Sequence, residues 1–262
     1  MRTNAFFFLF FFVPATFISC KTARKVATPN MEIKTAHASS RTDNFLIDLL
    51  KQYPHHFDSL LKHNAKWQVQ IIYTQVDRRE NNEPVFTNYY FNVEPNKYFY
   101  PASTVKMPIA ALALQKINEL KIPGLNRNTT MVTEALSEDL TGVFNDPTSE
   151  DGRPTIEHYI KKIFLVSDND AFNRLYEFLG QDYIHTSLNN MGYDSVQILH
   201  RLSIALNEEQ NRTTNPIKFY DASGKIIYQQ PVLKSNLIYQ QRNTLLGKGF
   251  MRNGQLVNEP FD

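Results

Sequence analysis

Residues 101–120 read PASTVKMPIAALALQKINEL. Ser103 and Lys106 stand at the start of this stretch, and the residues that follow from Met107 are apolar as far as Leu114. A helix that is apolar on almost every side is usually buried in a protein core. The stretch therefore predicts a buried helix from Met107 to Leu120, with a hydroxyl and an amine just before it.

Ser103 and Lys106 are three positions apart, which on a helix places both side chains on one face. A serine hydroxyl is a weak nucleophile until a base removes its proton, and burial can lower the pKa of a lysine enough for this task. The positive end of the helix also favours negative charge that develops on a substrate. The pair predicts nucleophilic catalysis, with Ser103 as the nucleophile and Lys106 as its base.

The spacing alone is a weak signal, because a chain of this length contains about one Ser-x-x-Lys by chance. Ser59 and Lys62 have the same spacing, but they fall in an amphipathic helical pattern where Lys62 is expected to face water. Ser103 differs, since strand-like segments precede it and the helix after it is too apolar for the surface. We therefore favour the catalytic interpretation at Ser103.

A second group of polar residues, Ser167-Asp168-Asn169, lies between two helical patterns. This tripeptide is rarer, occurring by chance on the order of a few times in a hundred such chains. Its structural interpretation is an N-cap for the helix expected from Ala171, because Ser, Asp and Asn are favoured there. Both roles are compatible if Asp168 or Asp170 caps the helix while Ser167 and Asn169 point into a cleft.

In the rest of the chain, apolar residues recur at helical spacing near the start and in the middle, and strand-like patterns lie between and after these segments. We expect helices at 45–50, with Asp43 as N-cap, at 57–61, at 156–166 with Thr155 as N-cap, at 171–179 and at 182–190. We expect strands at 66–76 and 85–93, and a hairpin formed by 218–221 and 225–230.

The segment 102–106, followed by Ser167-Asp168-Asn169, resembles the class A β-lactamases and related penicillin-recognising serine hydrolases. The resemblance implies an α/β sandwich, an antiparallel sheet flanked by helices, beside an all-helical lobe at about 107–191. It implies that Ser103 is acylated and that Lys106 activates it. By the same resemblance, Ser167 relays a proton to the leaving nitrogen, Asn169 holds the substrate amide and Asp168 is structural.

A third region, Ser203 to Asn207, is similar to the active-site loop of class A enzymes, which places Asn207 among the substrate-binding residues. That loop normally opens with a glutamate that primes a water for hydrolysis of the acyl-enzyme, and this chain has Ser203 at the matching position. Glu208 and Glu209 lie further along the loop. The replacement of the glutamate by Ser203 leaves open whether the acyl-enzyme is hydrolysed quickly or slowly; an ordinary polar loop is the alternative interpretation of the region.

The Lys-Thr-Gly triplet of the family has no counterpart here, and Gly247-Lys248-Gly249 is the nearest string. We therefore expect a C-terminally truncated chain with an incomplete sheet.

The N-terminus carries the pattern of an export signal, with Arg2 before a Phe-rich apolar stretch. Phe17-Ile18-Ser19-Cys20 resembles the site at which bacterial lipoproteins are cleaved and acylated, although Phe17 replaces the usual Leu. We expect a signal peptide at 1–19, a lipid-anchored flexible tether at 20–42 and the hydrolase domain at 43–262. This places the protein outside the cytoplasm, periplasmic or membrane-anchored in a bacterial envelope. An incidental or buried Cys20 thiol is the alternative.

Composition limits the possible partners. The net charge is +2, from 28 basic and 26 acidic residues, which gives no basic field for nucleic acid. The histidines lack metal-ligand spacing, and the nine glycines offer little for a nucleotide loop, so we expect no metal and no cofactor. We expect a monomer whose substrate is a β-lactam or a peptidoglycan-like peptide.

Three functions remain open at this point. The first is a serine hydrolase that forms an acyl-enzyme with β-lactams and opens their ring. The second is a penicillin-binding D,D-peptidase with slow deacylation. The third is a non-catalytic envelope lipoprotein that keeps the fold for binding.

Overall fold

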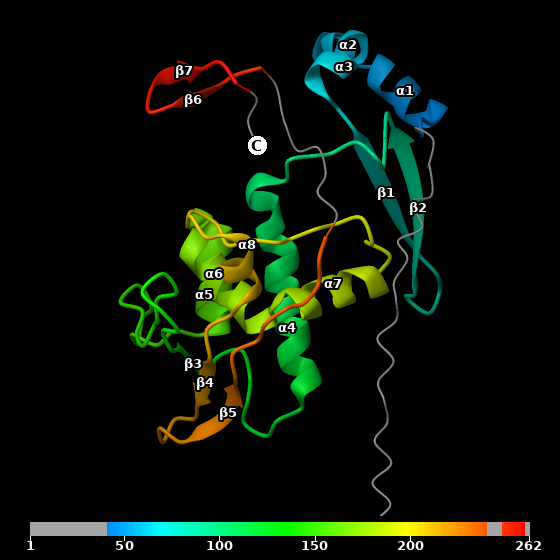
Figure 1. Ribbon diagram of the computed structural model, residues 1–262. Coiled ribbons are helices and arrows are strands. Elements are labelled where there is room, and N and C mark those ends of the chain that lie inside the picture. The colour runs from blue at the N-terminus through cyan, green and yellow to red at the C-terminus, as the bar shows by residue number, and fades with distance from the viewer. Residues whose placement is uncertain (1–40, 240–247, 260–262) are drawn as a thin grey trace, which may run out of the picture. The chain divides into compact units, whose positions relative to one another are not determined.

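The computed structural model describes residues 41–239 and 248–259 (Figure 1). The expected signal peptide, Cys20 and nearly all of the expected tether lie outside the described residues, as does Gly247 of the Gly247-Lys248-Gly249 string. The described residues all belong to one compact unit, the second along the chain. No helix in the described part of the chain is both long and apolar enough to span a membrane.

Helices and strands alternate in groups along the second unit. Their bounds are α1 Asn44–Lys51, α2 Pro54–Lys62, α3 Asn64–Trp67, β1 Ile71–Arg78, β2 Pro84–Phe91, the 3-10 helix η1 Ala102–Val105, α4 Lys106–Leu120, β3 Thr130–Thr133, α5 Ile156–Val166, α6 Asn169–Leu179, α7 Gln181–Asn190, α8 Glu208–Arg212, β4 Ile217–Tyr220, β5 Ile226–Gln230, β6 Phe250–Arg252 and β7 Gln255–Val257.

Strands β1 and β2 form an antiparallel pair in which Ile71 lies opposite Phe91. Helix α1 packs on this pair, and its Leu46 and Leu50 are buried together with Phe91. Asp43 stands at the N-cap position of α1, as expected, but its carboxylate does not cap the helix. The carboxylate instead accepts a hydrogen bond of 2.7 Å from the backbone N–H of Tyr90, which ties the start of α1 to β2.

The expected strand 66–76 is wrong at its beginning. Asn64–Trp67 forms the short helix α3, and Gln68 ends it in the left-handed conformation with φ of 51°. β1 starts only at Ile71. The predicted strand counted Trp67 as one of its alternating apolar residues. In the structure Trp67 is 60% exposed, so it is not on the buried face of a strand.

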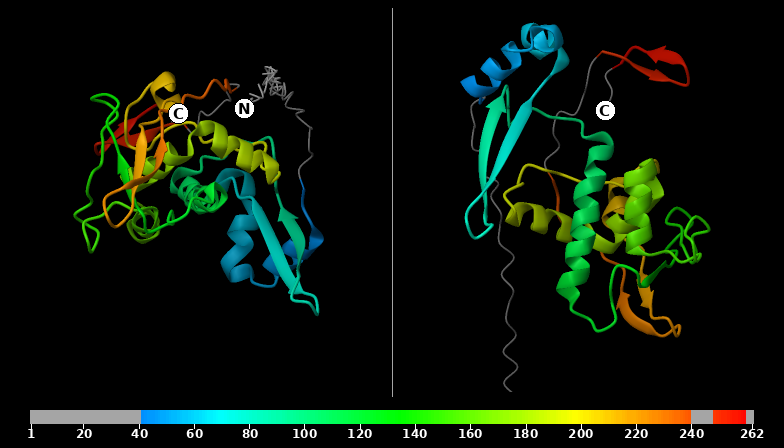
Figure 2. Two further views of the ribbon diagram at one scale, coloured as in Figure 1. Left: turned by 90° about the horizontal axis from the view of Figure 1, so that it is seen from below. Right: turned by 180° about the vertical axis from the view of Figure 1, so that it is seen from behind.

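The main hydrophobic core lies among α4, α5, α6 and α7, which are drawn in green to yellow in Figures 1 and 2. The expected burial of α4 is confirmed for one face, which carries Lys106, Ile109, Ala110, Leu112, Ala113 and Ile117, whereas Met107 is 64% exposed. Helix α6 is buried more completely, because every residue from Ala171 to Leu179 is buried. Both helices therefore hold the residues at their N-terminal ends on a rigid support.

Three strands, β3, β4 and β5, form a second antiparallel sheet. The predicted hairpin is confirmed in β4 and β5, and Thr133 of β3 lies opposite Ile217 of β4. β3 was not expected from the sequence, since its four residues are too few to show a period. β6 and β7 pair as a separate hairpin. The mixed α/β architecture with antiparallel sheets confirms the fold class predicted from the sequence.

Candidate active site

Ser103 lies in η1, one turn before the start of α4. The chain enters this turn through Ala102, whose φ of 45° is left-handed and strained for a residue with a Cβ. The Thr104 hydroxyl donates a hydrogen bond of 2.6 Å to the carbonyl oxygen of Pro101, which closes the turn. Ser103 is exposed at the surface, whereas Lys106 is only 2% exposed.

The ammonium group of Lys106 joins three of the residues predicted from the sequence. Its Nζ lies 3.3 Å from Oγ of Ser103, 2.9 Å from Oγ of Ser167 and 2.6 Å from Oδ1 of Asn169. It also donates a hydrogen bond to the carbonyl oxygen of Ser167. We call these four residues, Ser103, Lys106, Ser167 and Asn169, the Lys106 cluster.

Burial lowers the pKa of Lys106 below its usual value, and the negative charge of Asp168 partly opposes that change. A lysine with a lowered pKa is more often unprotonated near neutral pH and can then accept a proton. The two hydroxyls beside it, on Ser103 and Ser167, are on exposed residues. The cluster thus combines a buried base with two hydroxyls that a substrate can reach.

The turn between α5 and α6 presents Ser167 and Asn169 to Lys106. Ser167 ends α5 in the left-handed conformation, with φ of 55°. Asp168 is the N-cap of α6, and its Oδ1 accepts a hydrogen bond of 2.8 Å from the backbone N–H of Ala171. The capping interpretation is therefore confirmed for Asp168, while the side chains on either side of it face the Lys106 ammonium group.

The loop between α7 and α8 reaches the same cluster at Ser203. Nδ2 of Asn169 donates a hydrogen bond of 2.6 Å to Oγ of Ser203. Asn207 has another role in the structure, because it forms a capping box with Gln210 at the start of α8. The structure therefore brings Ser203 to the cluster and commits the side chain of Asn207 to a helix cap. Substrate binding by Asn207 stays a prediction.

A family model described as the beta-lactamase enzyme family matches residues 55–253. The match covers most of the chain, including every residue of the Lys106 cluster. The chain belongs to the beta-lactamase enzyme family. No curated protein matches the chain in the comparison. Membership supports a β-lactamase-like hydrolase with a small-molecule substrate.

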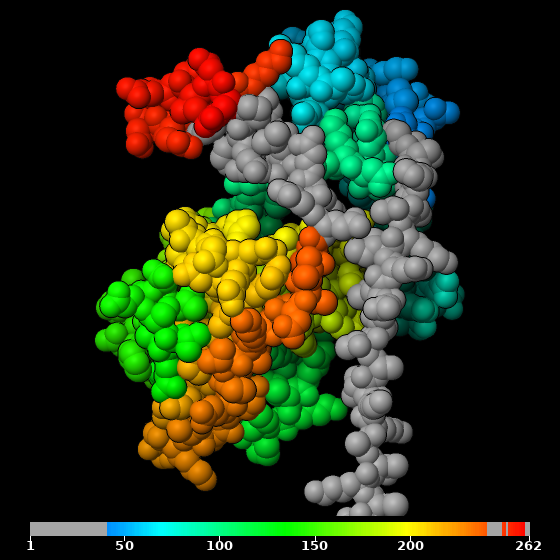
Figure 3. Space-filling view, viewed as in Figure 1, coloured from blue at the N-terminus to red at the C-terminus, as the bar shows by residue number. Residues whose placement is uncertain are grey.

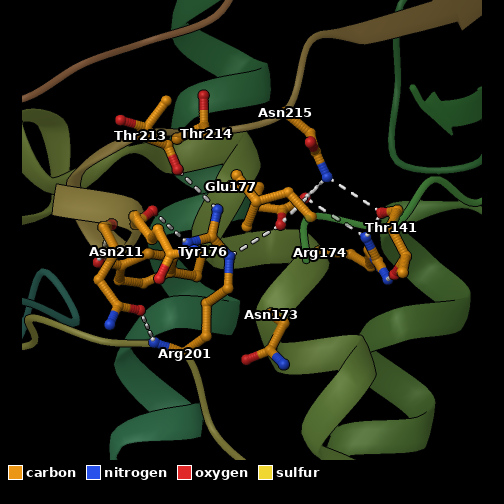
Figure 4. A network of polar contacts seen from close by, with 12 residues as sticks. Thr141, Asn173, Arg174, Tyr176, Glu177, Arg201, Asn211, Thr213, Thr214 and Asn215 are labelled. Carbon is orange, nitrogen blue, oxygen red and sulfur yellow. Dashed lines mark hydrogen bonds and ion pairs between the residues drawn. The ribbon is translucent and has the colours of Figure 1, made fainter. Parts of the chain in front are cut away.

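This beta-lactamase-family chain also holds a buried ion network that sequence reasoning missed (Figure 4). Nε of Arg201 lies 2.9 Å from Oε1 of Glu177, and NH1 of Arg174 lies 3.5 Å from Oε2 of Glu177. The side chains of Arg201 and Glu177 are 1% and 2% exposed. The available signal was a glutamate and an arginine inside the apolar helix AFNRLYEFL, 171–179.

Arg201 also fastens the loop that carries Ser203. Its guanidinium group donates hydrogen bonds of 3.1 Å to the carbonyl oxygen of Gln210 and 2.8 Å to that of Thr213. One side chain therefore ties the segment just before Ser203 to α8 and to the residue that follows α8. In Figure 3 this loop (yellow) lies beside the segment around 134–152 (green), in agreement with the 2.9 Å hydrogen bond from Gln210 to Asp139.

A cavity of about 230 Å³ lies elsewhere in the beta-lactamase-family domain. Its lining includes Lys116, Gln181, Tyr183 and Lys234, and no member of the Lys106 cluster. Burial lowers the pKa of Lys116 to about 8. Among the described residues, no group of three or more His, Cys, Asp or Glu side chains is placed to hold a metal ion.

Proposed function

We propose that this chain is a serine hydrolase that forms an acyl-enzyme with β-lactams through Ser103. The observation that supports the proposal is the Lys106 cluster, in which one buried amine contacts the hydroxyl groups of both Ser103 and Ser167. Membership in the beta-lactamase enzyme family agrees with this chemistry.

The proposed reaction begins with unprotonated Lys106, which takes the proton of the Ser103 hydroxyl as Oγ attacks the lactam carbonyl carbon. The carbon–nitrogen bond of the ring then breaks. Ser167 gives its proton to the leaving nitrogen and receives one from the Lys106 ammonium group, 2.9 Å away. Lys106 ends unprotonated, and the acyl group remains on Ser103. Asn169 would hold the substrate amide from its place beside Lys106.

The test uses a fluorescent penicillin, with label on the denatured protein as the readout. We expect the native chain to be labelled and Ser103→Ala to carry no label. The matched control is Ser59→Ala, because Ser59 and Lys62 have the same spacing while Lys62 is exposed and pairs with Asp58 at 2.6 Å. Absence of label on the native chain, or equal label on Ser103→Ala, would refute the proposal.

A second candidate function is a penicillin-binding D,D-peptidase that deacylates slowly. The observation in its favour is Ser203, which lies against Asn169 where the resemblance expects a glutamate. A serine hydroxyl is a much weaker base for water than a carboxylate. We expect the acyl-enzyme to persist after excess penicillin is removed; steady turnover of a chromogenic cephalosporin would contradict this candidate.

We also propose that the protein is exported and that Cys20 is the site of a lipid anchor in a bacterial envelope. The support is the pattern of residues 1–20. Expression with a radiolabelled fatty acid should label the native chain but not Cys20→Ala. Equal labelling of the two would contradict the anchor. In the absence of any acylation of Ser103, a non-catalytic envelope lipoprotein would be the remaining candidate.

A further inference from the structure

Lys162 lies outside the Lys106 cluster and connects two acidic groups. Its Nζ is 3.1 Å from Oδ2 of Asp146 and 3.4 Å from Oδ2 of Asp168. The Lys162 side chain is 18% exposed and that of Asp146 is 7% exposed. These contacts are therefore shielded from solvent far more than a surface ion pair, which is worth little.

Asp146 is a fixed charge on the far side of Lys162. Its carboxylate accepts a hydrogen bond of 3.0 Å from the backbone N–H of Thr148, and its backbone N–H donates one of 2.9 Å to the carbonyl oxygen of Gly152. Burial alone would raise its pKa, but the hydrogen bonds from Thr148 and Lys162 and the charge of Lys162 bring the pKa of Asp146 to about 2. It is therefore ionised across the working pH range and holds Lys162 in place.

Asp168 is the acidic group nearest to the chemistry. It stands between Ser167 and Asn169, and its charge is the one that opposes the lowered pKa of Lys106. Its two carboxylate oxygens have different partners, since Oδ1 caps α6 and Oδ2 faces Lys162. A cation on Oδ2 weakens the field of Asp168 at Lys106, because the two charges have opposite sign.

We propose that Lys162 is a positioning residue of acylation, whose ammonium group holds the Ser167–Asn169 turn and counters the negative charge of Asp168 at Lys106. The inference rests on the proposed function of Ser103 and Lys106. Without Lys162, the uncompensated Asp168 keeps Lys106 protonated to higher pH, so that Ser103 is acylated more slowly at neutral pH.

Two further ionisable groups lie close to Asp146 or Asp168, and each has a partner of its own. Nε2 of His158 lies 3.4 Å from Oδ2 of Asp146. Asp170, also in the first turn of α6, pairs with Arg174 at 2.8 Å. Within the part of the chain that the structure describes, the charged groups paired with Lys162 are Asp146 and Asp168, and Asp168 is the one that also acts on Lys106.

The test measures the rate of Ser103 labelling by a fluorescent penicillin between pH 5 and 10. The rate should rise with pH as Lys106 loses its proton. We expect Lys162→Met to move the midpoint of this rise upward by about half a unit or more, which makes labelling about threefold or more slower at neutral pH. Lys162→Arg should restore the native midpoint. The control is Lys161→Met, since Lys161 is 62% exposed and pairs only with Glu157 at 3.5 Å among the described residues.

A second pair of variants separates charge from folding. Asp168→Asn keeps a side chain that caps helices well, and it should move the midpoint downward. In that background Lys162→Met should still move the midpoint upward but by less, because the charge of Lys162 acts on Lys106 independently of Asp168, whereas its ion pair with the turn is already lost. The charge effect is overturned if the Asp168→Asn midpoint equals the native one. The hold on the turn is overturned if Lys162→Met shifts the midpoint equally with and without Asp168.

The outcomes also distinguish this inference from the proposed function. A native chain without label overturns both. A native chain that is labelled normally, with an unmoved midpoint in folded Lys162→Met, overturns only the role of Lys162. If Lys162→Met does not fold, Lys162→Gln takes its place in the same assay, because it keeps a donor for the two carboxylates and removes only the charge.

Discussion

Replacement of Arg201 by methionine tests the buried network directly. The substitution keeps much of the side-chain volume but removes the guanidinium group that lies 2.9 Å from Glu177. It leaves the Glu177 carboxylate buried with Arg174 at 3.5 Å as its nearest cation. Loss of one partner from a buried ion pair typically lowers the free energy of unfolding by about 3–5 kcal/mol. The carbonyl oxygens of Gln210 and Thr213 also lose their donor, so we expect an effect at the upper end of that range.

The pH dependence of this variant supplies a second measurement. Burial raises the pKa of Glu177 even in the native protein, against the charges of Arg201 and Arg174. A carboxyl group whose pKa is raised on folding stabilises the protein below its unfolded pKa, and this contribution is lost as pH rises through the folded pKa. Without Arg201 the pKa of Glu177 rises further, so the deficit in Arg201→Met should grow between pH 5 and pH 8.

The assay is urea denaturation of the native chain and Arg201→Met at both pH values. Lys234→Met is the control, because Lys234 also pairs with a glutamate, Glu209, at 2.8 Å, while both side chains are more than half exposed. That control should change the free energy of unfolding by about 1 kcal/mol or less. An equally small change in Arg201→Met at pH 8 would refute the reasoning.

Three further predictions concern single groups. Burial lowers the pKa of Lys116 to about 8, so the folded protein binds fewer protons than the unfolded chain between about pH 8 and pH 10.5. The free energy of unfolding should therefore fall as pH falls through this range. Lys116→Met should lose this dependence in urea titrations at pH 7 and 10. Asp146→Asn should cost about 2 kcal/mol at pH 7, and the deficit should vanish as acid protonates native Asp146 near pH 2. Thr155→Ala should cost about 1 kcal/mol in thermal unfolding, since its Oγ1 accepts a hydrogen bond of 3.0 Å from the N–H of His158.

The sequence predicted those parts of the fold whose signals are local. The helices at 106–120, 156–166 and 169–179 have a period and a cap or a stop in their own residues, and all three are present. The hairpin of β4 and β5 follows from its turn residues. Strand β3 could not be predicted, because its four residues are held by hydrogen bonds to β4, more than eighty positions along the chain.

The candidate site divides in the same way. Ser103 and Lys106 meet through helical spacing, and Ser167 and Asn169 flank a helix cap, so local rules place each pair. Contacts among the buried Glu177, Arg174 and Arg201 depend on how α6 packs against the loop between α7 and α8. No local sequence pattern predicts that packing. The position of Lys162 between Asp146 and Asp168 is non-local for the same reason.

The backbone at Ser167 carries one more consequence. A residue with a side chain at φ of 55° is strained by about 1 kcal/mol relative to glycine, which adopts this conformation freely. Ser167→Gly should therefore make the protein harder to unfold while it deletes the hydroxyl beside Lys106. A selection for heat resistance alone would accept this replacement, whereas a selection for catalysis would reject it if Ser167 has its proposed role in proton transfer. Under the proposed role of Ser167, the strained backbone at this position is therefore retained together with the hydroxyl that the reaction uses.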